Sequence, residues 1–140
     1  MRLATTALAA VLLAACAADP RSEPTLWTRL GGQAVVAGVV AETLERSATD
    51  PRTRRSFEGV KIERVKQKLT EQICELAAGP CRYSGDPMKP VHQGLKITAA
   101  EFDLLVQFLR EALDHAHVGL AEKNELLRLL APMKRDIVAA

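Results

Sequence analysis

The sequence is poor in aromatic residues and has no excess of charge of either sign. Phe, Tyr and Trp make up 4% of its 140 residues, which argues against the stacking surfaces of single-strand nucleic-acid binders. Its 19 basic and 17 acidic side chains give a formal net charge of +2. Near-neutrality excludes a strongly basic nucleic-acid binder and an acidic disordered tail. We expect no nucleic-acid partner.

Regular alternation of apolar and polar residues is also missing, and so are internal repeats. With 48% hydrophobic and 26% charged residues, the composition is that of an ordinary small globular domain. Its length suits one such domain. The apolar residues that are present recur at three- and four-residue steps, which predicts an all-α architecture.

The N-terminus carries a short uncharged run. Arg2 precedes 13 residues without charge, 3–15, and a membrane-spanning helix needs about 20, so this run predicts the core of a secretory signal. It ends in Leu-Ala-Ala-Cys16, which is similar to the cleavage motif of bacterial lipoproteins. We expect a signal peptide over 1–15, a lipidated Cys16 that anchors the chain to a membrane, and a tether over 16–24. A plain secretory signal is the alternative. The expected location is the cell envelope, as a periplasm-facing lipoprotein at the outer membrane.

Two further cysteines, Cys74 and Cys81, lie close together in the sequence. In an oxidising envelope compartment such a pair is a disulfide candidate. The bond would close an eight-residue loop and stabilise the fold by roughly 2–2.5 kcal/mol. Two free buried thiols and a metal-binding pair are the alternatives, although no histidine lies nearby at ligand spacing.

Four main helices are predicted, with an irregular segment in the middle of the chain. One carries valines from Val35 to Leu44, and a second has an apolar face from residue 62 to 76. Thr98 and Glu101 form a capping box at the start of the third. We expect the third helix to bury five residues: Phe102, Leu105, Leu109, Leu113 and Ala116. In the last helix Pro132 should produce a kink.

Shorter helical pieces are expected between these helices. A turn of helix should precede Gly31-Gly32. Asp50-Pro51 predicts another short helix up to Phe57, with Asp50 as N-cap and Pro51 at the first helical position. Pro87 and Pro90 restrict the segment around His92 to a short helix or an irregular turn.

The three histidines do not form a metal cluster. His115 and His117 lie two residues apart near a predicted helix end, so they point to different faces and most simply interact with the helix dipole. His92 follows a long loop, beside Met88 and Val91. A single imidazole does not make a zinc site, but it is sufficient to hold a haem iron. Such a site also needs an apolar slot, for which residues 62–76, Phe57 and Lys68 are available.

The order of these residues resembles group I truncated haemoglobins, which are small two-over-two helical globins. The resemblance covers residues 26–138 without gaps. It rests on motifs that occur in the same order: LWTRLGG (26–32), DPR (50–52), FEG (57–59), GP (79–80), YSGDPM (83–88), VHQGLKI (91–97) and APMKRDIV (131–138). The resemblance implies a truncated globin domain over 25–140, with a short irregular proximal segment and haem b, iron protoporphyrin IX, as cofactor.

The resemblance also implies roles for individual residues. His92 matches the proximal histidine that binds the haem iron. Phe57 matches the phenylalanine that stacks on the porphyrin, and Lys68 matches a position that reaches a haem propionate. Val65 and Leu69 match positions on the open side of the iron. The remaining positions implied to line the pocket, on the proximal side, are Met88, Ile97 and Phe102.

The chain departs from the family pattern on the distal side. Leu44 occupies the place of a tyrosine in relatives with strong oxygen chemistry, Thr43 replaces a phenylalanine, and Leu69 occupies a position often held by glutamine. The expected distal pocket of Leu44, Val65 and Leu69 therefore has no evident hydrogen-bond donor, and Gln72 falls outside the apolar stripe. Without a donor, oxygen retention is expected to be about 10- to 100-fold weaker.

The resemblance implies reversible binding of a diatomic ligand (oxygen, nitric oxide or carbon monoxide) in oxygen transport or buffering. The alternative is a haem redox enzyme of the cell envelope, a nitric oxide dioxygenase or a reductase of nitrogen oxides or peroxide, with an electron donor as partner. A helical lipoprotein without haem is a third reading. The sequence does not separate carrier from enzyme.

Overall fold

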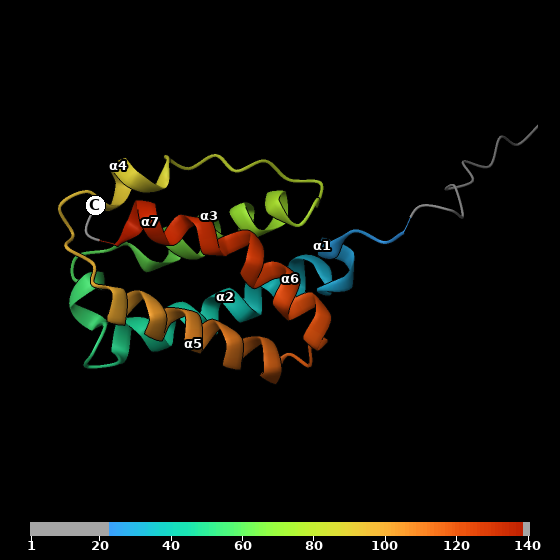
Figure 1. Ribbon diagram of the computed structural model, residues 1–140, viewed down its shortest axis with the longest axis horizontal. Coiled ribbons are helices and arrows are strands. Elements are labelled where there is room, and N and C mark those ends of the chain that lie inside the picture. The colour runs from blue at the N-terminus through green and yellow to red at the C-terminus, as the bar shows by residue number, and fades with distance from the viewer. Residues whose placement is uncertain (1–22, 139–140) are drawn as a thin grey trace, which may run out of the picture.

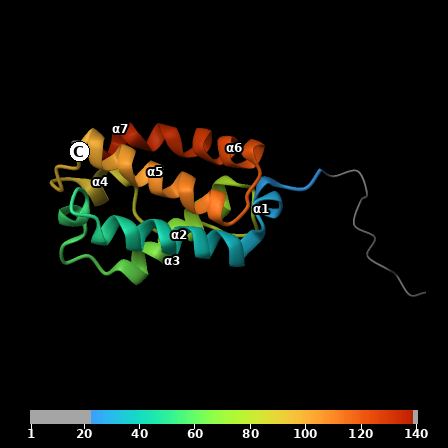
Figure 2. The same cartoon turned by 90° about the horizontal axis from the view of Figure 1, so that it is seen from below.

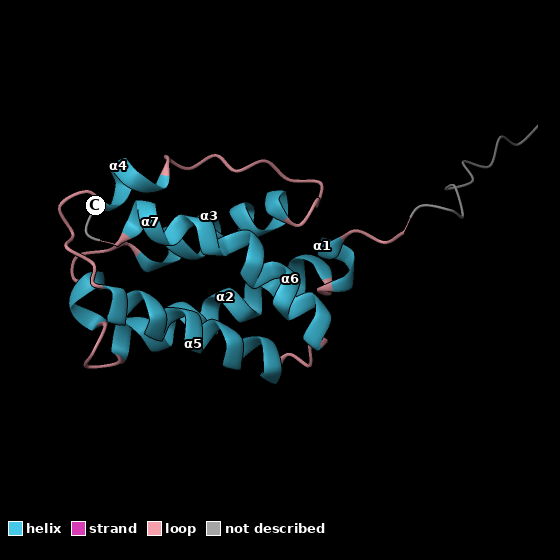
Figure 3. Cartoon of the chain, viewed as in Figure 1, coloured by secondary structure: helices cyan, strands magenta, loops and turns pink. Residues whose placement is uncertain are grey.

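The computed structural model describes residues 23–138, and in this range all regular structure is helical (Figure 3). The expected all-α class is confirmed. The predicted signal peptide and Cys16 lie outside the described residues. No helix in the described range is long and apolar enough to cross a membrane.

The helices follow one another as the apolar pattern predicts. They are α1 (Leu26–Arg29), α2 (Gly32–Thr49), η1 (Arg54–Phe57), α3 (Ile62–Leu76), α4 (Met88–His92), α5 (Ala99–His115), α6 (Leu120–Leu130), η2 (Ala131–Met133) and α7 (Lys134–Ile137). The four longest, α2, α3, α5 and α6, correspond to the four expected helices. The kink predicted at Pro132 is a one-turn 3-10 segment that separates α6 from α7.

Helix α2 is the centre of the fold, and it packs against both α3 and α5. Figure 2 shows α5, α6 and α7 on one side of the molecule and α2 and α3 on the other. The core between them consists of fully buried aliphatic side chains, among them Val40, Leu44, Ile73, Leu113 and Leu126. Buried apolar surface of this kind supplies most of the stability of such a fold.

Helix α1 and helix α4 lie at opposite ends of the molecule (Figure 1). The Trp27 amide donates a hydrogen bond of 2.8 Å to the Ala77 carbonyl at the end of α3, and α1 also packs against α6. Helix α4 packs against α7. The short helix that carries His92 is therefore held mainly by the C-terminal segment.

The prediction of a helix starting at Asp50-Pro51 is wrong. Asp50 is the C-cap of α2, and its carboxylate accepts hydrogen bonds from the backbone amide and side chain of Arg52. The side chain therefore closes a turn instead of capping a helix, as aspartate commonly does. Only a 3-10 turn follows, from Arg54 to Phe57.

The buried face of α5 also differs in part from the prediction. Leu109 and Leu113 are buried as expected, whereas Ala116 is exposed and Phe102 and Leu105 are only half-buried. Leu104, Phe108 and Ala112 are buried as well. Apolar residues cover more than one face of this helix, so the choice of buried face is set by its contact with α2.

Candidate functional site

His92 ends the short helix α4, and its imidazole is oriented by the backbone. Its Nδ1 lies 2.7 Å from the Met88 carbonyl oxygen, and because a carbonyl only accepts, Nδ1 carries the proton and donates. In a neutral imidazole the lone pair is then on Nε2, which makes no hydrogen bond with any described residue. A neutral imidazole held in this tautomer is the form that ligates a metal.

The loop after His92 is fixed by backbone conformation and by an arginine. Gly94 and Lys96 both adopt positive φ, +81° and +53°, which turns the chain sharply towards α5. Arg55 Nη2 donates to the Lys96 carbonyl at 3.0 Å. The segment between His92 and α5 is thereby tied to η1.

A set of apolar side chains is packed against the core on one side and still partly open on the other. Among the side chains of this kind, Ile62, Val65 and Leu69 share one face of α3 by their spacing. Together with the half-buried Phe57 and Leu105, they are called the open apolar face here. The expected proximal residues Met88, Ile97 and Phe102 are half-buried as well. Apolar surface that stays open commonly marks a binding site. One oriented imidazole nitrogen together with apolar surroundings fits a haem, which needs a single strong axial ligand and an apolar slot.

The residues expected on the distal side come from α2 and α3, two helices that pack against each other. Leu44 is 2% exposed in the core cluster against which Val65 and Leu69 pack. The nearby hydroxyls do not serve the pocket, because Thr43 Oγ1 donates to the Val39 carbonyl at 2.7 Å and Ser47 Oγ to the Thr43 carbonyl at 2.8 Å. Helix α2 thus contributes apolar surface here.

Gln72 is the polar residue that sequence analysis set aside. It is only 9% exposed, and its carboxamide has no hydrogen-bond partner among the described residues. The signal was present in the sequence, because Gln72 follows Leu69 by three residues and Val65 by seven. Residues at these intervals share one face of a helix.

The Lys68 ammonium forms hydrogen bonds with two nearby side chains, those of Glu71 and Ser84. Its Nζ lies 2.8 Å from Glu71 Oε2 and 2.6 Å from Ser84 Oγ. The hydrogen bonds from Lys68 and Ser84 lower the pKa of Glu71 from its ordinary 4.5 to about 2. The contact joins α3 to the loop before α4, and a role of Lys68 at a propionate stays a prediction.

Cys74 and Cys81 form a disulfide in the structure, with their Cα atoms 5.8 Å apart. The bond fastens the end of α3 to the start of the long loop. Gly79 lies beneath it, and a Cβ there would be 2.6 Å from Cys74 Sγ and 2.8 Å from the Trp27 ring. Only glycine fits at this point.

The other histidines lie on the surface. His115 Nδ1 is 2.8 Å from Glu42 Oε1, and both His115 and His117 are exposed. Within residues 23–138 no three His, Cys, Asp or Glu side chains are grouped as metal ligands.

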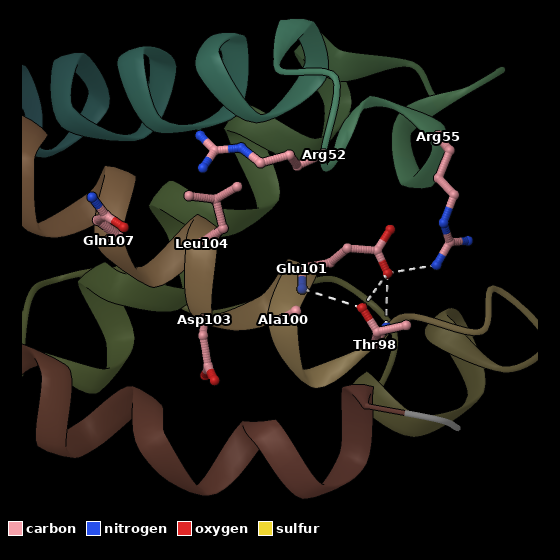
Figure 4. Close-up of a pocket in the computed structure, with 8 residues that line it drawn as sticks. All are labelled: Arg52, Arg55, Thr98, Ala100, Glu101, Asp103, Leu104 and Gln107. Carbon is pink, nitrogen blue, oxygen red and sulfur yellow. Dashed lines mark hydrogen bonds and ion pairs between the residues drawn. The ribbon is translucent and has the colours of Figure 1, made fainter.

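A hollow of about 600 Å³ between η1 and the start of α5 is shown in Figure 4. Its charged side chains are already paired: Arg55 with Glu101, Arg52 with Asp50 and Asp103 with Lys134. Burial opposes ionisation of Glu101, but hydrogen bonds from Thr98 and Ser56 and the charge of Arg55 outweigh it and lower the pKa of that carboxylate. His92 does not line this hollow. The ion pair of Arg55 with Glu101 beside it holds η1 against α5.

Comparison with known proteins agrees with this arrangement. The family model described as "Bacterial-like globin" matches residues 25–139. The group 1 truncated hemoglobin GlbN of Mycolicibacterium paratuberculosis is 34% identical over 118 residues, which cover 84% of this chain and 87% of the relative. GlbN of a Nostoc species is 30% identical and covers 81% of this chain and 97% of the relative.

Solved structures of truncated haemoglobins share the fold. The Fe(III) form from Tetrahymena pyriformis has a TM-score of 0.78 at 22% identity and covers 84% of this chain and 100% of that one. The 2/2 hemoglobin from a Synechococcus species, in the cyanomet state with covalently attached heme, has a TM-score of 0.76 at 23% identity with the same coverage. The chain belongs to the bacterial-like globin family and is a truncated globin of group I, a membership that implies a haem cofactor.

Proposed function

We propose that this chain holds haem b through His92 and reversibly binds a diatomic ligand in the space bordered by Leu44, Val65 and Leu69. The observation that carries the proposal is the His92 imidazole, whose Nδ1 is committed to the Met88 carbonyl while Nε2 has no partner among the described residues. When bound, the haem supplies an iron atom that takes up small diatomic molecules on its open side.

The protein's own contribution is to orient one ligand and to exclude water. Phe57, Val65 and Leu69 offer apolar surface against which a planar ring can be buried, and burial of several hundred Å² is worth on the order of 10 kcal/mol before the costs of binding. Met88, Ile97 and Phe102 extend this surface on the proximal side. The hydrogen bond to the Met88 carbonyl restrains rotation of the imidazole, which would present Nε2 to the haem.

The absorption spectrum of the full-length chain, purified after expression with a supply of haem, tests the proposal. We expect a Soret band that shifts when carbon monoxide is added to the reduced protein. A colourless protein that takes up no added hemin would overturn it.

Reversible binding is favoured over reduction of peroxide or nitrogen oxides by the chemistry of the distal side. Leu44, Val65 and Leu69 carry no titratable group, so they neither deliver nor accept the protons that reduction of peroxide or nitrogen oxides requires. Stopped-flow mixing of the oxygenated protein with nitric oxide separates the two functions. Slow single turnover supports the carrier, and rapid nitrate formation sustained by a reductant supports the nitric oxide dioxygenase.

From the sequence alone, we further propose that the domain is anchored in the cell envelope through a lipid on Cys16. The supporting feature is the uncharged run that ends in Leu-Ala-Ala-Cys16. Cys16→Ser is expected to abolish incorporation of labelled palmitate and to release the protein from the membrane fraction. Unchanged labelling would contradict the anchor.

A further inference from the structure

We propose that Gln72 is the hydrogen-bond donor of the distal pocket and that it sets the preference of this globin for oxygen over carbon monoxide. The inference rests on the proposed haem site. It replaces the expectation of a distal pocket without any donor.

The first argument is the burial of an unpaired amide. Gln72 is 9% exposed and has no hydrogen bond to any described residue, yet no fully occluded side-chain nitrogen or oxygen in the described range lacks a partner. The Gln72 amide atoms therefore border open space instead of solid core. Because the amide borders open space, its N–H groups are accessible to a small acceptor, which would take the place of water there.

The second argument is the face of α3 on which Gln72 lies. It follows Val65 by nearly two helical turns and Leu69 by about one. The opposite face of α3 lines a different hollow of about 500 Å³, through Lys66, Gln67 and Thr70. Gln72 does not line that hollow, and its spacing places it on the face of α3 that carries Val65 and Leu69.

The third argument is that the neighbouring donors are committed elsewhere. The hydroxyls of Thr43 and Thr70 donate to carbonyls of their own helices. The Lys68 ammonium, one turn before Gln72, is held by Glu71 and Ser84. Of these polar side chains, the Gln72 amide is the one that is not committed to another residue.

A donor at this position discriminates between diatomic ligands. Oxygen gains negative charge when it binds to ferrous haem, whereas carbon monoxide gains little, and hydrogen bonds to a charged acceptor are about twice as strong as those to a neutral one. The Gln72 amide, which stays neutral and keeps its two N–H donors at all ordinary pH values, therefore retains oxygen selectively.

The test uses the full-length holoprotein and three variants. Gln72→Leu removes the donor at similar size, and Gln72→Glu replaces it by a carboxylate that only accepts when ionised. Gln67→Leu is the matched control, because Gln67 lies on the opposite face of α3 and bonds to Glu71 at 3.0 Å. The readouts are the rates of oxygen and carbon monoxide dissociation and the infrared C–O stretching frequency of the carbon monoxide complex.

We expect oxygen to dissociate about tenfold faster from both Gln72 variants, a change of about 1.4 kcal/mol, with carbon monoxide dissociation within about twofold of the parent. The C–O frequency should rise in both, because a donor near the ligand lowers it, and Gln67→Leu should match the parent. If the Gln72 variants keep the parent's Soret band, oxygen rate and C–O frequency, the role of Gln72 is overturned while the haem site stands. If the parent takes up no haem, the proposed function falls, and this inference falls with it.

Discussion

At the scale of a single residue, the site depends on how His92 is held. Its ring is fixed by one hydrogen bond to the Met88 carbonyl within a helix of five residues. Pro87 and Pro90 restrict the backbone around it. The hydrogen bond and the two prolines therefore restrain the imidazole without an ion pair to any of the described residues.

Removing this imidazole should remove the haem. His92→Gly is expected to lose tight haem binding, and added imidazole should restore the Soret band because the small molecule fills the vacated place. Absorption titration with hemin measures the effect. His117→Gly is the control, since His117 is exposed and has a φ of +56° that glycine adopts easily. An unchanged spectrum in His92→Gly would disprove the axial assignment.

Leu44 tests the distal side at the same scale. Leu44→Tyr is expected to slow oxygen dissociation by about 10- to 100-fold, because a phenol supplies a strong donor. Leu44 is 2% exposed, so the larger ring also crowds the core, and Leu44→Phe separates crowding from hydrogen bonding. Equal oxygen rates in the two variants would mean that position 44 does not face the ligand.

Individual site residues were predictable only where a motif names them. His92 and the distal leucines follow from the resemblance, which the family match supports. Gln72 was set aside as lying outside the apolar stripe, although its spacing from Val65 and Leu69 places it on the same face of α3. Its burial follows from the packing of α3 against the rest of the fold, which a single sequence does not display.

At the scale of an element, helix ends are set by local chemistry. The bounds of α3, Ile62–Leu76, coincide with the predicted apolar face, and the capping box at the start of α5 is present as predicted. The prediction for Asp50 was wrong because an aspartate side chain can either close a turn or cap a helix. Here it accepts a hydrogen bond from the Arg52 amide and closes a turn. On α5, Phe102 and Leu105 look like core residues in the sequence but belong to a surface left half-open.

The capping box of α5 should contribute measurably to stability. Thr98→Ala removes the hydroxyl that accepts from the Glu101 amide at 3.2 Å, and it is expected to lower the free energy of unfolding by about 1 kcal/mol. Urea denaturation of the apoprotein measures this. Thr98→Ser keeps the hydroxyl and should stay within a few tenths of a kcal/mol of the parent. Identical urea midpoints for Thr98→Ala and the parent would show that the cap does not contribute to stability.

At the scale of the whole molecule, the sequence predicted the helix order and the family, but not the open side of the structure. The all-α class and four main helices follow from periodicity. The open apolar face does not, because a half-buried Phe57 or Val65 and a fully buried Leu44 look alike in a list of apolar residues. Only the arrangement of α2, α3 and α5 distinguishes them.

Acid should weaken the whole fold. Hydrogen bonds from Arg52 lower the pKa of Asp50 from 3.8 to about 2, and those from Lys68 and Ser84 lower that of Glu71 from 4.5 to about 2. Both carboxylates bind protons more weakly in the folded state, so their stabilisation is complete above pH of about 4.5 and is lost as pH falls towards 2.

The expected observation is a melting temperature of the apoprotein that falls steadily over this pH window. Glu71→Gln should make the fall shallower, because its neutral amide does not titrate, while the contact with Ser84 is partly kept. A melting temperature that is flat from pH 4.5 to 2, or a Glu71→Gln profile as steep as that of the parent, would contradict this linkage.

The position of α1 has a mechanical consequence. The chain enters the domain at Thr25, and α1 is fastened to α3 through the Trp27 amide and to α6 through ion pairs of Arg29 with Glu122 and Glu125. A tensile load on the upstream chain is therefore borne by this fastening, at the end of the molecule remote from α4 (Figure 1). Force applied through the chain upstream of Thr25 would therefore strain α1 first and leave helix α4, which carries His92, undisturbed.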